Sequence, residues 1–149
     1  MIKKISCCFL FLSLLLAQFS IAEEKFLSLK KDKVNVRYGP SFETKIKYIY
    51  KKRNLPLKQI DKKENFRRVV DLKNNSGWIH ISQLKKSNSI IILEDKVLFK
   101  KPSKLSRPVA RLEMGRLLII KKCENMWCNI ITDDFFGWIK AENIWGSIK

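Results

Sequence analysis

Apolar and polar residues alternate in short runs along the chain from residue 26 onwards, and no stretch there has sustained helical periodicity. Alternation over four to eight residues is typical of half-buried strands. The expected strands of the first half are 26–30, 34–37, 46–50, 55–60, 66–71 and 78–81. Turn signals separate them, notably Tyr38-Gly39-Pro40-Ser41 and Asn74-Asn75-Ser76-Gly77. Pro56 favours an edge position for its strand.

The same order of elements then occurs a second time. Residues 64–84 and 124–144 both open on Glu-Asn and reach Gly-Trp-Ile, at Gly77–Ile79 and Gly137–Ile139. A period of about 60 residues is too long for a solenoid unit and suits a small all-β domain. Short strands at regular turn spacing predict small barrels or sandwiches. The expected strands of the second half are 90–93, 96–99, 108–112, 117–121, 127–130 and 137–139.

The first 22 residues are expected to lie outside the fold. Met1–Lys4 is a short cationic start, Ile5–Phe19 is almost unbroken apolar sequence, and small residues precede Glu23. These are the parts of a secretory signal peptide, and an uncleaved membrane anchor is the alternative. A lipidated cysteine would end the apolar run, whereas Cys7 and Cys8 are near its start. We therefore expect a periplasmic or secreted protein with no transmembrane segment after cleavage. Its domains are expected at 23–87 and 88–149, joined by a short linker over 85–89.

The formal net charge of +17 is unevenly distributed. Residues 27–87 carry 17 basic and 5 acidic side chains, a net charge of +12, whereas residues 88–149 carry 11 and 7, a net charge of +4. Contact with an anionic polymer is therefore expected mainly in the first half. A genome that favours Lys, Ile and Asn is the alternative explanation. Export argues against nucleic acid, and favours cell-wall polymer, lipopolysaccharide or an acidic membrane surface.

Two of the four cysteines remain after signal cleavage, Cys123 and Cys128, with four residues between them. A hairpin turn of this length would bring the two sulfurs together across neighbouring strands. Because an exported protein folds in an oxidising compartment, we expect a structural disulfide. For so short a loop it adds about 2 kcal/mol to the free energy of unfolding. The spacing is not that of a Cys-x-x-Cys redox centre, and too few ligands are present for zinc.

Four features together resemble the bacterial SH3-like family of exported proteins. They are Val34-Asn35-Val36-Arg37-x-Gly39-Pro40-Ser41, the pairs Phe66/Val69 and Trp127/Ile130, Gly-Trp-Ile twice, and Cys123 to Cys128 with a closing Ile144-Trp145-Gly146. The resemblance implies two tandem SH3-like barrels of about five strands each. It further implies a function like that of the family's members, which are wall-targeting or peptide-binding modules or stand-alone envelope proteins. The copies depart from the family pattern at different places. The first copy has Phe66 where the family usually has Trp, and Lys52-Arg53-Asn54 where the second copy has its turn glycine, Gly115. The second copy lacks the Arg-x-Gly of the first turn.

The candidate ligand residues are aromatic and basic. Gly39 is expected to adopt a positive φ, with Arg37 beside it free to pair with a carboxylate or phosphate; a solvated turn arginine is the alternative. Tyr38, Tyr48 and Tyr50 are candidates for an exposed surface that stacks on sugar or grips a proline-rich peptide. Trp127, at a hairpin tip, is either half exposed or packed over the barrel. Trp78 and Trp138 are expected to be core walls.

Catalytic chemistry has little support in the sequence. His80 is the only histidine and is expected to face solvent, and no Ser or Cys lies in a nucleophile motif. Asp133-Asp134 is expected to be a polar turn. We therefore predict a non-catalytic binding module without cofactor or metal, which contacts peptidoglycan or an envelope peptide. The alternative is a structural adaptor that docks to another envelope protein through an apolar patch around Phe135-Phe136 and Trp145.

Overall fold

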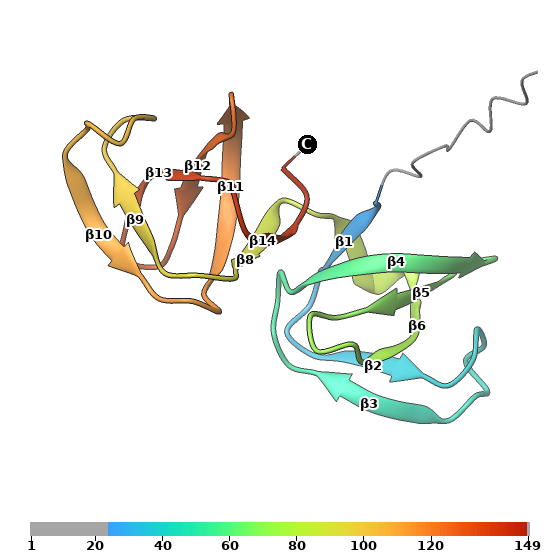
Figure 1. Ribbon diagram of the computed structural model, residues 1–149. Coiled ribbons are helices and arrows are strands. Elements are labelled where there is room, and N and C mark those ends of the chain that lie inside the picture. The colour runs from blue at the N-terminus through green and yellow to red at the C-terminus, as the bar shows by residue number, and fades with distance from the viewer. Residues whose placement is uncertain (1–23, 149) are drawn as a thin grey trace, which may run out of the picture.

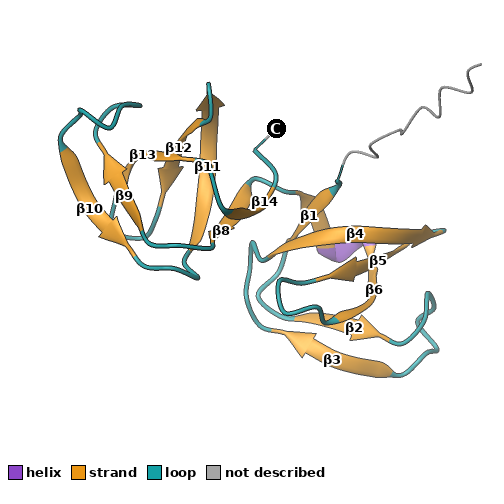
Figure 2. Cartoon of the chain, viewed as in Figure 1, coloured by secondary structure: helices purple, strands orange, loops and turns teal. Residues whose placement is uncertain are grey.

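The computed structural model describes residues 24–148, and the expected signal peptide lies outside them. The described chain is built from antiparallel strands in two seven-stranded sheets, each curled around its own core (Figure 1, Figure 2). The first sheet, here called the first module, has the order β3-β2-β6-β5-β4-β1-β7. Its elements are β1 (Phe26–Leu29), β2 (Val34–Arg37), β3 (Ile46–Tyr50), β4 (Pro56–Lys63), β5 (Phe66–Val70), β6 (Ser76–His80), a 3-10 turn η1 (Ile81–Gln83) and β7 (Leu84–Lys86).

The second sheet, the second module, repeats this order strand for strand as β10-β9-β13-β12-β11-β8-β14. The all-β prediction of two tandem small barrels is therefore confirmed. The elements are β8 (Ser89–Ile92), β9 (Lys96–Phe99), β10 (Pro108–Leu112), β11 (Leu117–Glu124), β12 (Trp127–Ile131), β13 (Phe136–Lys140) and β14 (Ile144–Gly146). The assignment of 23–87 and 88–149 as separate domains stays a prediction.

The pairing register shows which residues of the two modules are equivalent. Phe66 pairs with Lys63 across the β4–β5 turn as Trp127 pairs with Glu124 across the β11–β12 turn. The turns are thus 64–65 and 125–126, so the two Glu-Asn pairs are offset by one residue. The offset disappears at Gly-Trp-Ile because the loop after β5 spans 71–75 whereas its counterpart spans 132–135.

Each module has a separate hydrophobic core, and the Gly-Trp-Ile motif lets β6 and β13 pack closely on it. Ile79 and Ile139 are fully buried. A Cβ on Gly77 would lie 2.3 Å from Val36 Cγ1, and one on Gly137 would lie 2.6 Å from the Phe99 carbonyl oxygen. The glycines therefore permit close packing of β6 and β13 on their neighbours. The first core comprises Leu29, Val34, Val36, Leu57, Val69, Ile79 and Leu84, and the second Ile90, Ile92, Leu98, Leu112, Leu118, Cys128, Ile130, Ile139 and Ala141.

The expected core role of the two tryptophans is wrong. Side chains alternate across a strand, and Trp78 and Trp138 each lie between two buried residues in the sequence. Both indoles therefore point outward and are partly buried. The motif places glycine and isoleucine toward the core and tryptophan on the outer face.

Three local expectations also need correction. Pro56 opens β4, which lies between β1 and β5 rather than at an edge; a proline is compatible there because it is the first residue of the strand. Gly39 does not adopt a positive φ, whereas Asn54 (φ 62°) and Gly115 (φ 84°) do so at equivalent turns. The expected linker is partly strand, since β7 and β8 leave only residues 87–88 between them.

Three buried serines lie where the modules meet. Ser28 Oγ lies 2.7 Å from both Ser87 Oγ and Ser89 Oγ, and Ser89 Oγ donates to the Asn54 carbonyl oxygen at 2.6 Å. Buried hydroxyl groups need such partners, and here each finds them across the junction. These bonds join β1 of the first module to β8 of the second.

Trp145 adds a second contact across the same junction, which is visible where β14 approaches β1 and β4 in Figure 1. Its ring meets Phe26 edge to face at a centroid distance of 5.2 Å. Its indole Nε1–H donates to the Pro56 carbonyl oxygen at 3.0 Å. The two modules are therefore held together by these side-chain contacts as well as by the covalent linker.

Candidate functional site

The outward-facing side of the first module carries a row of charged and aromatic side chains. Arg37 on β2 pairs with Trp78 on β6, Trp78 pairs with Arg68 on β5, and Arg68 pairs with Asp61 on β4. Side chains at paired positions lie next to one another on one face of a sheet. Trp78 is thus flanked by two guanidinium-bearing residues. We call Arg37, Trp78 and Arg68, with the cluster described next, the first outer face.

An aromatic cluster extends this row toward the loop between β2 and β3. The Phe42 ring lies 5.2 Å from Phe66 and 4.8 Å from His80, which itself lies 5.1 Å from Phe66. His80 is partly buried, and its Nδ1 lies 2.8 Å from Ser82 Oγ. His80 points to the outer face of β6, as expected, and Phe42 folds back over part of its ring. Phe42 is 60% exposed and presents the free side of this cluster.

Arg37 fixes the loop that carries Phe42. Its Nη1 donates to the Phe42 carbonyl oxygen at 2.9 Å and to the Thr44 carbonyl oxygen at 2.7 Å. Its guanidinium also lies over the Phe42 ring, 5.5 Å from the centroid. Thr44 Oγ1 donates to the Gly39 and Ser41 carbonyl oxygens at 2.9 and 2.7 Å. Arg37 is therefore a positioning residue for the loop, and its ligand role stays a prediction.

The three candidate tyrosines lie together on the β3 side of the module. Lys47 Nζ lies 5.7 Å from the Tyr38 ring centroid and 5.9 Å from that of Tyr48. Tyr48 and Tyr50 meet edge to face at 5.2 Å, and Tyr50 donates to Asp71 Oδ2 at 3.0 Å. Tyr38 is 66% exposed, whereas Tyr48 and Tyr50 are partly buried against the core. Burial, followed by the hydrogen bond to Tyr48, raises the pKa of Tyr50, and burial raises that of Tyr48.

The second module keeps the tryptophan of the first outer face, as Trp138, but carries different residues around it. Phe99 stands where Arg37 does, Trp127 where Phe66 does, and Lys140 where His80 does. Trp127 is partly buried and meets Phe99 edge to face at 5.9 Å. Both rings line a hollow of about 260 Å³ with Lys104.

Carboxylates at the margin of this hollow are held ionised. A hydrogen bond from Lys96 and one from Asn143 lower the pKa of Glu94. The Met114 backbone N–H and Arg111 lower the pKa of Asp95. This end of the second module therefore carries both charge signs, with Lys104 and Lys140 beside the two carboxylates.

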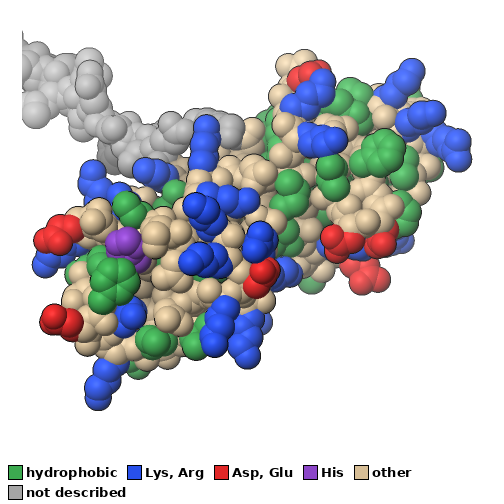
Figure 3. Space-filling view, turned by 180° about the vertical axis from the view of Figure 1, so that it is seen from behind, with side chains coloured by type: hydrophobic (Ala, Val, Ile, Leu, Met, Phe, Trp, Pro, Cys, Tyr) green, Lys and Arg blue, Asp and Glu red, His purple; other side chains and the backbone are tan. Residues whose placement is uncertain are grey.

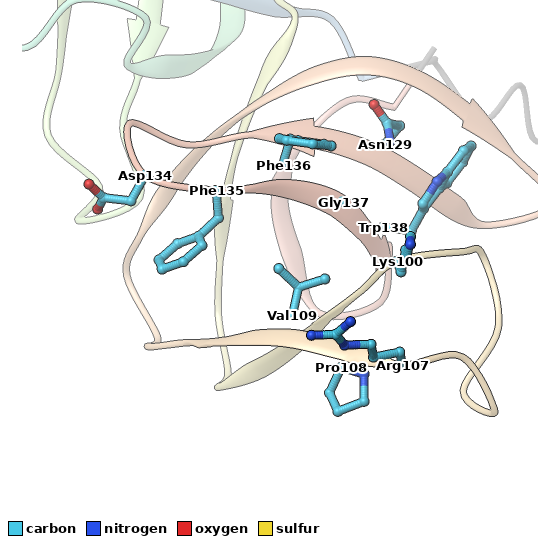
Figure 4. A pocket seen from close by; sticks show the side chains of 10 residues that line it. All are labelled: Lys100, Arg107, Pro108, Val109, Asn129, Asp134, Phe135, Phe136, Gly137 and Trp138. Atoms are coloured by element: carbon cyan, nitrogen blue, oxygen red, sulfur yellow. The ribbon is translucent and has the colours of Figure 1, made fainter.

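A larger groove, of about 480 Å³, lies next to this hollow, since Trp138, which lines the groove, pairs with Phe99 (Figure 4). Phe135 borders it from the β12–β13 connection and Phe136 from the start of β13, and Trp138 and Lys100 border it from the opposite side. Phe136 is 76% exposed. Other lining residues are Arg107, Pro108, Val109, Asn129, Asp134 and Gly137.

The predicted disulfide is present between Cys123 and Cys128, with an S–S distance of 2.00 Å. It joins paired positions of β11 and β12. The equivalent pair in the first module is Lys62 and Arg67. There Arg67 Nη1 donates to the carbonyl oxygens of Glu64 and Phe66 at 2.8 and 2.9 Å. An arginine thus ties the hairpin end in one module where a disulfide ties it in the other.

Lys and Arg side chains project over much of the face in Figure 3, with a group near its middle, and acidic side chains form smaller groups toward its margins. Within residues 24–148, no three His, Cys, Asp or Glu side chains gather closely enough to hold a metal ion. In the same range, no helix has the length and apolarity that a membrane crossing requires.

Residues 30–86 and 94–146 each match the family model of the bacterial SH3 domain. The chain belongs to the bacterial SH3 domain family. The matched stretches cover nearly all strands of the two modules, so the expected resemblance is confirmed for both copies. No curated protein matches the chain.

Two solved structures similar to this bacterial SH3 protein are those of NlpC2 and NlpC1 from Trichomonas vaginalis. The first is 11% identical with a TM-score of 0.39 and covers 83% of this chain. The second is 13% identical with a TM-score of 0.38 and covers 86% of this chain. This chain spans 48% of the length of each.

Sequence reasoning did not identify several residues of these sites. Phe42 lies in a polar loop, where an isolated aromatic residue is the only signal of an exposed ring. Arg68 is one of two adjacent arginines between apolar residues, and its place beside Trp78 follows only from the strand register. The groove of the second module depends on Lys100 and Arg107, which meet because the loop between them closes.

Proposed function

We propose that this protein is a non-catalytic binding module of the bacterial envelope, and that its first outer face contacts the peptidoglycan of the cell wall. The observation that carries the proposal is the row in which Trp78 lies between Arg37 and Arg68, next to the exposed Phe42. This row belongs to the part of the chain that has a net charge of +12.

The chemistry of the row suits a polymer of sugars and acidic peptides. Aromatic rings offer flat apolar surface for the C–H faces of sugar rings. The planar guanidinium of Arg68 matches a carboxylate with two parallel hydrogen bonds, and Arg37 holds the Phe42 ring in place. Export through a cleaved signal peptide is part of the proposal, and the Cys123–Cys128 disulfide supports an oxidising compartment.

Co-sedimentation with isolated sacculi tests this function directly. Purified residues 23–149 are expected to pellet with sacculi at low salt and to be released as the ionic strength rises, because the contact is largely electrostatic. Arg68→Asn is expected to weaken pelleting clearly. Lys73→Asn removes one charge from an exposed loop of the same module and is expected to change it little. Failure to pellet at low salt, or equal effects of the two variants, would exclude the proposal.

A structural adaptor is the second candidate function, and one observation favours it. Phe135 and Phe136 are 39% and 76% exposed on the second module, so apolar surface is available for docking. Trp145 is not part of this patch, because it packs at the junction of the modules. Docking through apolar surface is expected to persist at high salt, which separates it from polymer binding.

A further inference from the structure

The groove of the second module has aromatic walls and a basic end. Phe136 and Trp138 lie on neighbouring outward positions of β13, and Phe135 precedes them. Lys100 and Arg107 meet at the base of the loop between β9 and β10, where the Lys100 backbone N–H donates to the Arg107 carbonyl oxygen at 2.9 Å. Figure 4 shows both of these side chains away from Phe135. The volume of about 480 Å³ is within the range of small-ligand sites.

Neither cation at the basic end has an ion-pair partner among residues 24–148. Asp134, which also lines the groove, is 3.4 Å from Arg116 and so has a partner of its own. The charge of the groove is therefore positive, and it is concentrated at one end. A complementary ligand carries an apolar body and a negative group at one terminus.

In the first module, a lysine fills the part of the equivalent place that corresponds to Phe135, Phe136 and Val109. Its counterparts of Phe135, Phe136 and Val109 are Asn75, Ser76 and Lys47. Lys47 Nζ donates to the Ser76 carbonyl oxygen at 2.9 Å and lies over the rings of Tyr38 and Tyr48. A lysine thus occupies this region in one module, and an open aromatic groove occupies it in the other.

We propose that this groove binds the C-terminal end of an extended peptide. The terminal carboxylate pairs with Arg107 and Lys100, and an apolar side chain lies between Phe136 and Trp138. A peptide is favoured because β10 is an edge strand whose outer side has no strand partner in the described chain. An extended chain can bond such an edge through its backbone. The Asn129 side chain in the groove offers a further amide.

The proposal deepens the adaptor function, since it names the chemistry that the second module recognises. It does not depend on the first outer face. A protein that fails to bind sacculi can still bind peptide ends, and the reverse also holds.

Binding of peptide C-termini is tested by adding two peptide pools to isotope-labelled residues 23–149 and following the backbone amide and tryptophan indole signals by NMR. One pool contains N-acetylated tetrapeptides that end in Leu, Phe or Ala with a free carboxylate, and the other has the same sequences with C-terminal amides. The free-acid pool is expected to shift the Trp138 indole resonance and the backbone resonances of 135–137. The amide pool is expected to bind about tenfold more weakly, because a hydrogen-bonded charge pair is lost.

Variants distinguish specific binding at this groove from nonspecific peptide binding. Arg107→Ser is expected to remove the preference for free carboxylate, and Phe136→Ser is expected to weaken both pools. The matched controls are Lys45→Ser and Ser76→Ala, at the counterpart positions of the first module, and neither is expected to change binding. Absence of shifts with both pools, equal binding of acid and amide, or an unchanged preference in Arg107→Ser would overturn the proposal. Sacculus pelleting of the same variants is expected to be unchanged, which separates the two functions.

Discussion

Replacement of Trp145 by alanine is expected to uncouple the two modules. Trp145 belongs to β14 of the second module, yet its ring contacts Phe26 and its indole N–H bonds the Pro56 carbonyl oxygen of the first. The equivalent residue in the first module is Lys85, which is exposed. The indole therefore serves the junction more than its own barrel.

The magnitude follows from the contacts. The hydrogen bond contributes about 1 kcal/mol and the edge-to-face ring pair about 1 kcal/mol. Trp145 is only partly buried, so lost packing adds less than for a buried tryptophan, about 1 kcal/mol. Trp145→Ala is thus expected to cost about 3 kcal/mol of free energy of unfolding, and Trp145→Phe about 1 kcal/mol because it keeps a ring but not the N–H.

Scanning calorimetry and urea denaturation followed by circular dichroism measure this effect. The wild-type protein is expected to unfold in one transition, and Trp145→Ala in two, because the modules then unfold independently. A double-mutant cycle with Phe26→Ala is expected to give a coupling energy of about 1 kcal/mol. Lys85→Ala is the control and is expected to have no effect. A loss below about 0.5 kcal/mol for Trp145→Ala, or a cycle without coupling, would refute the reasoning.

Three further predictions concern the single modules. Reduction of the Cys123–Cys128 disulfide is expected to cost about 2 kcal/mol, as measured by denaturation with and without reductant, and an unchanged midpoint would contradict it. The pKa of Tyr50 is raised by burial, so the unfolded state loses this proton first; stability is expected to fall above about pH 10, and Tyr50→Phe to reduce that fall in a pH series of melting temperatures. Gly77→Ala is expected to cost more than about 2 kcal/mol in denaturant unfolding because its Cβ would lie 2.3 Å from Val36 Cγ1, and a neutral result would show that β6 moves freely.

The fold was predictable because its signals are local and occur twice. Alternation gave the strands, and Gly-Trp-Ile marked the same strand in both copies. The direction of the tryptophans was not predictable from hydrophobicity, since a large apolar residue between two buried neighbours faces outward. Gly77 is required because β6 packs closely on Val36, and the sequence pattern does not reveal how near the two strands lie.

The candidate sites were less predictable because they depend on neighbours across strands and modules. The exposed aromatic surface was expected around three tyrosines, of which only Tyr38 is strongly exposed. The binding role of Arg37 was expected from its turn, but its bonds to the loop carbonyls arise from the way residues 38–45 fold back. The place of Trp145 at the junction follows from the packing of β14 on β4, which lie far apart in the sequence.

The four tryptophan indole resonances test the central claim most directly. Labelled residues 23–149 are titrated with soluble peptidoglycan fragments, and the indole signals of Trp78, Trp127, Trp138 and Trp145 are followed. The account predicts that the Trp78 signal shifts first, together with the ring signals of Phe42 and His80, whereas Trp145 stays unchanged at the junction. An unmoved Trp78 signal in the presence of bound fragment would contradict it.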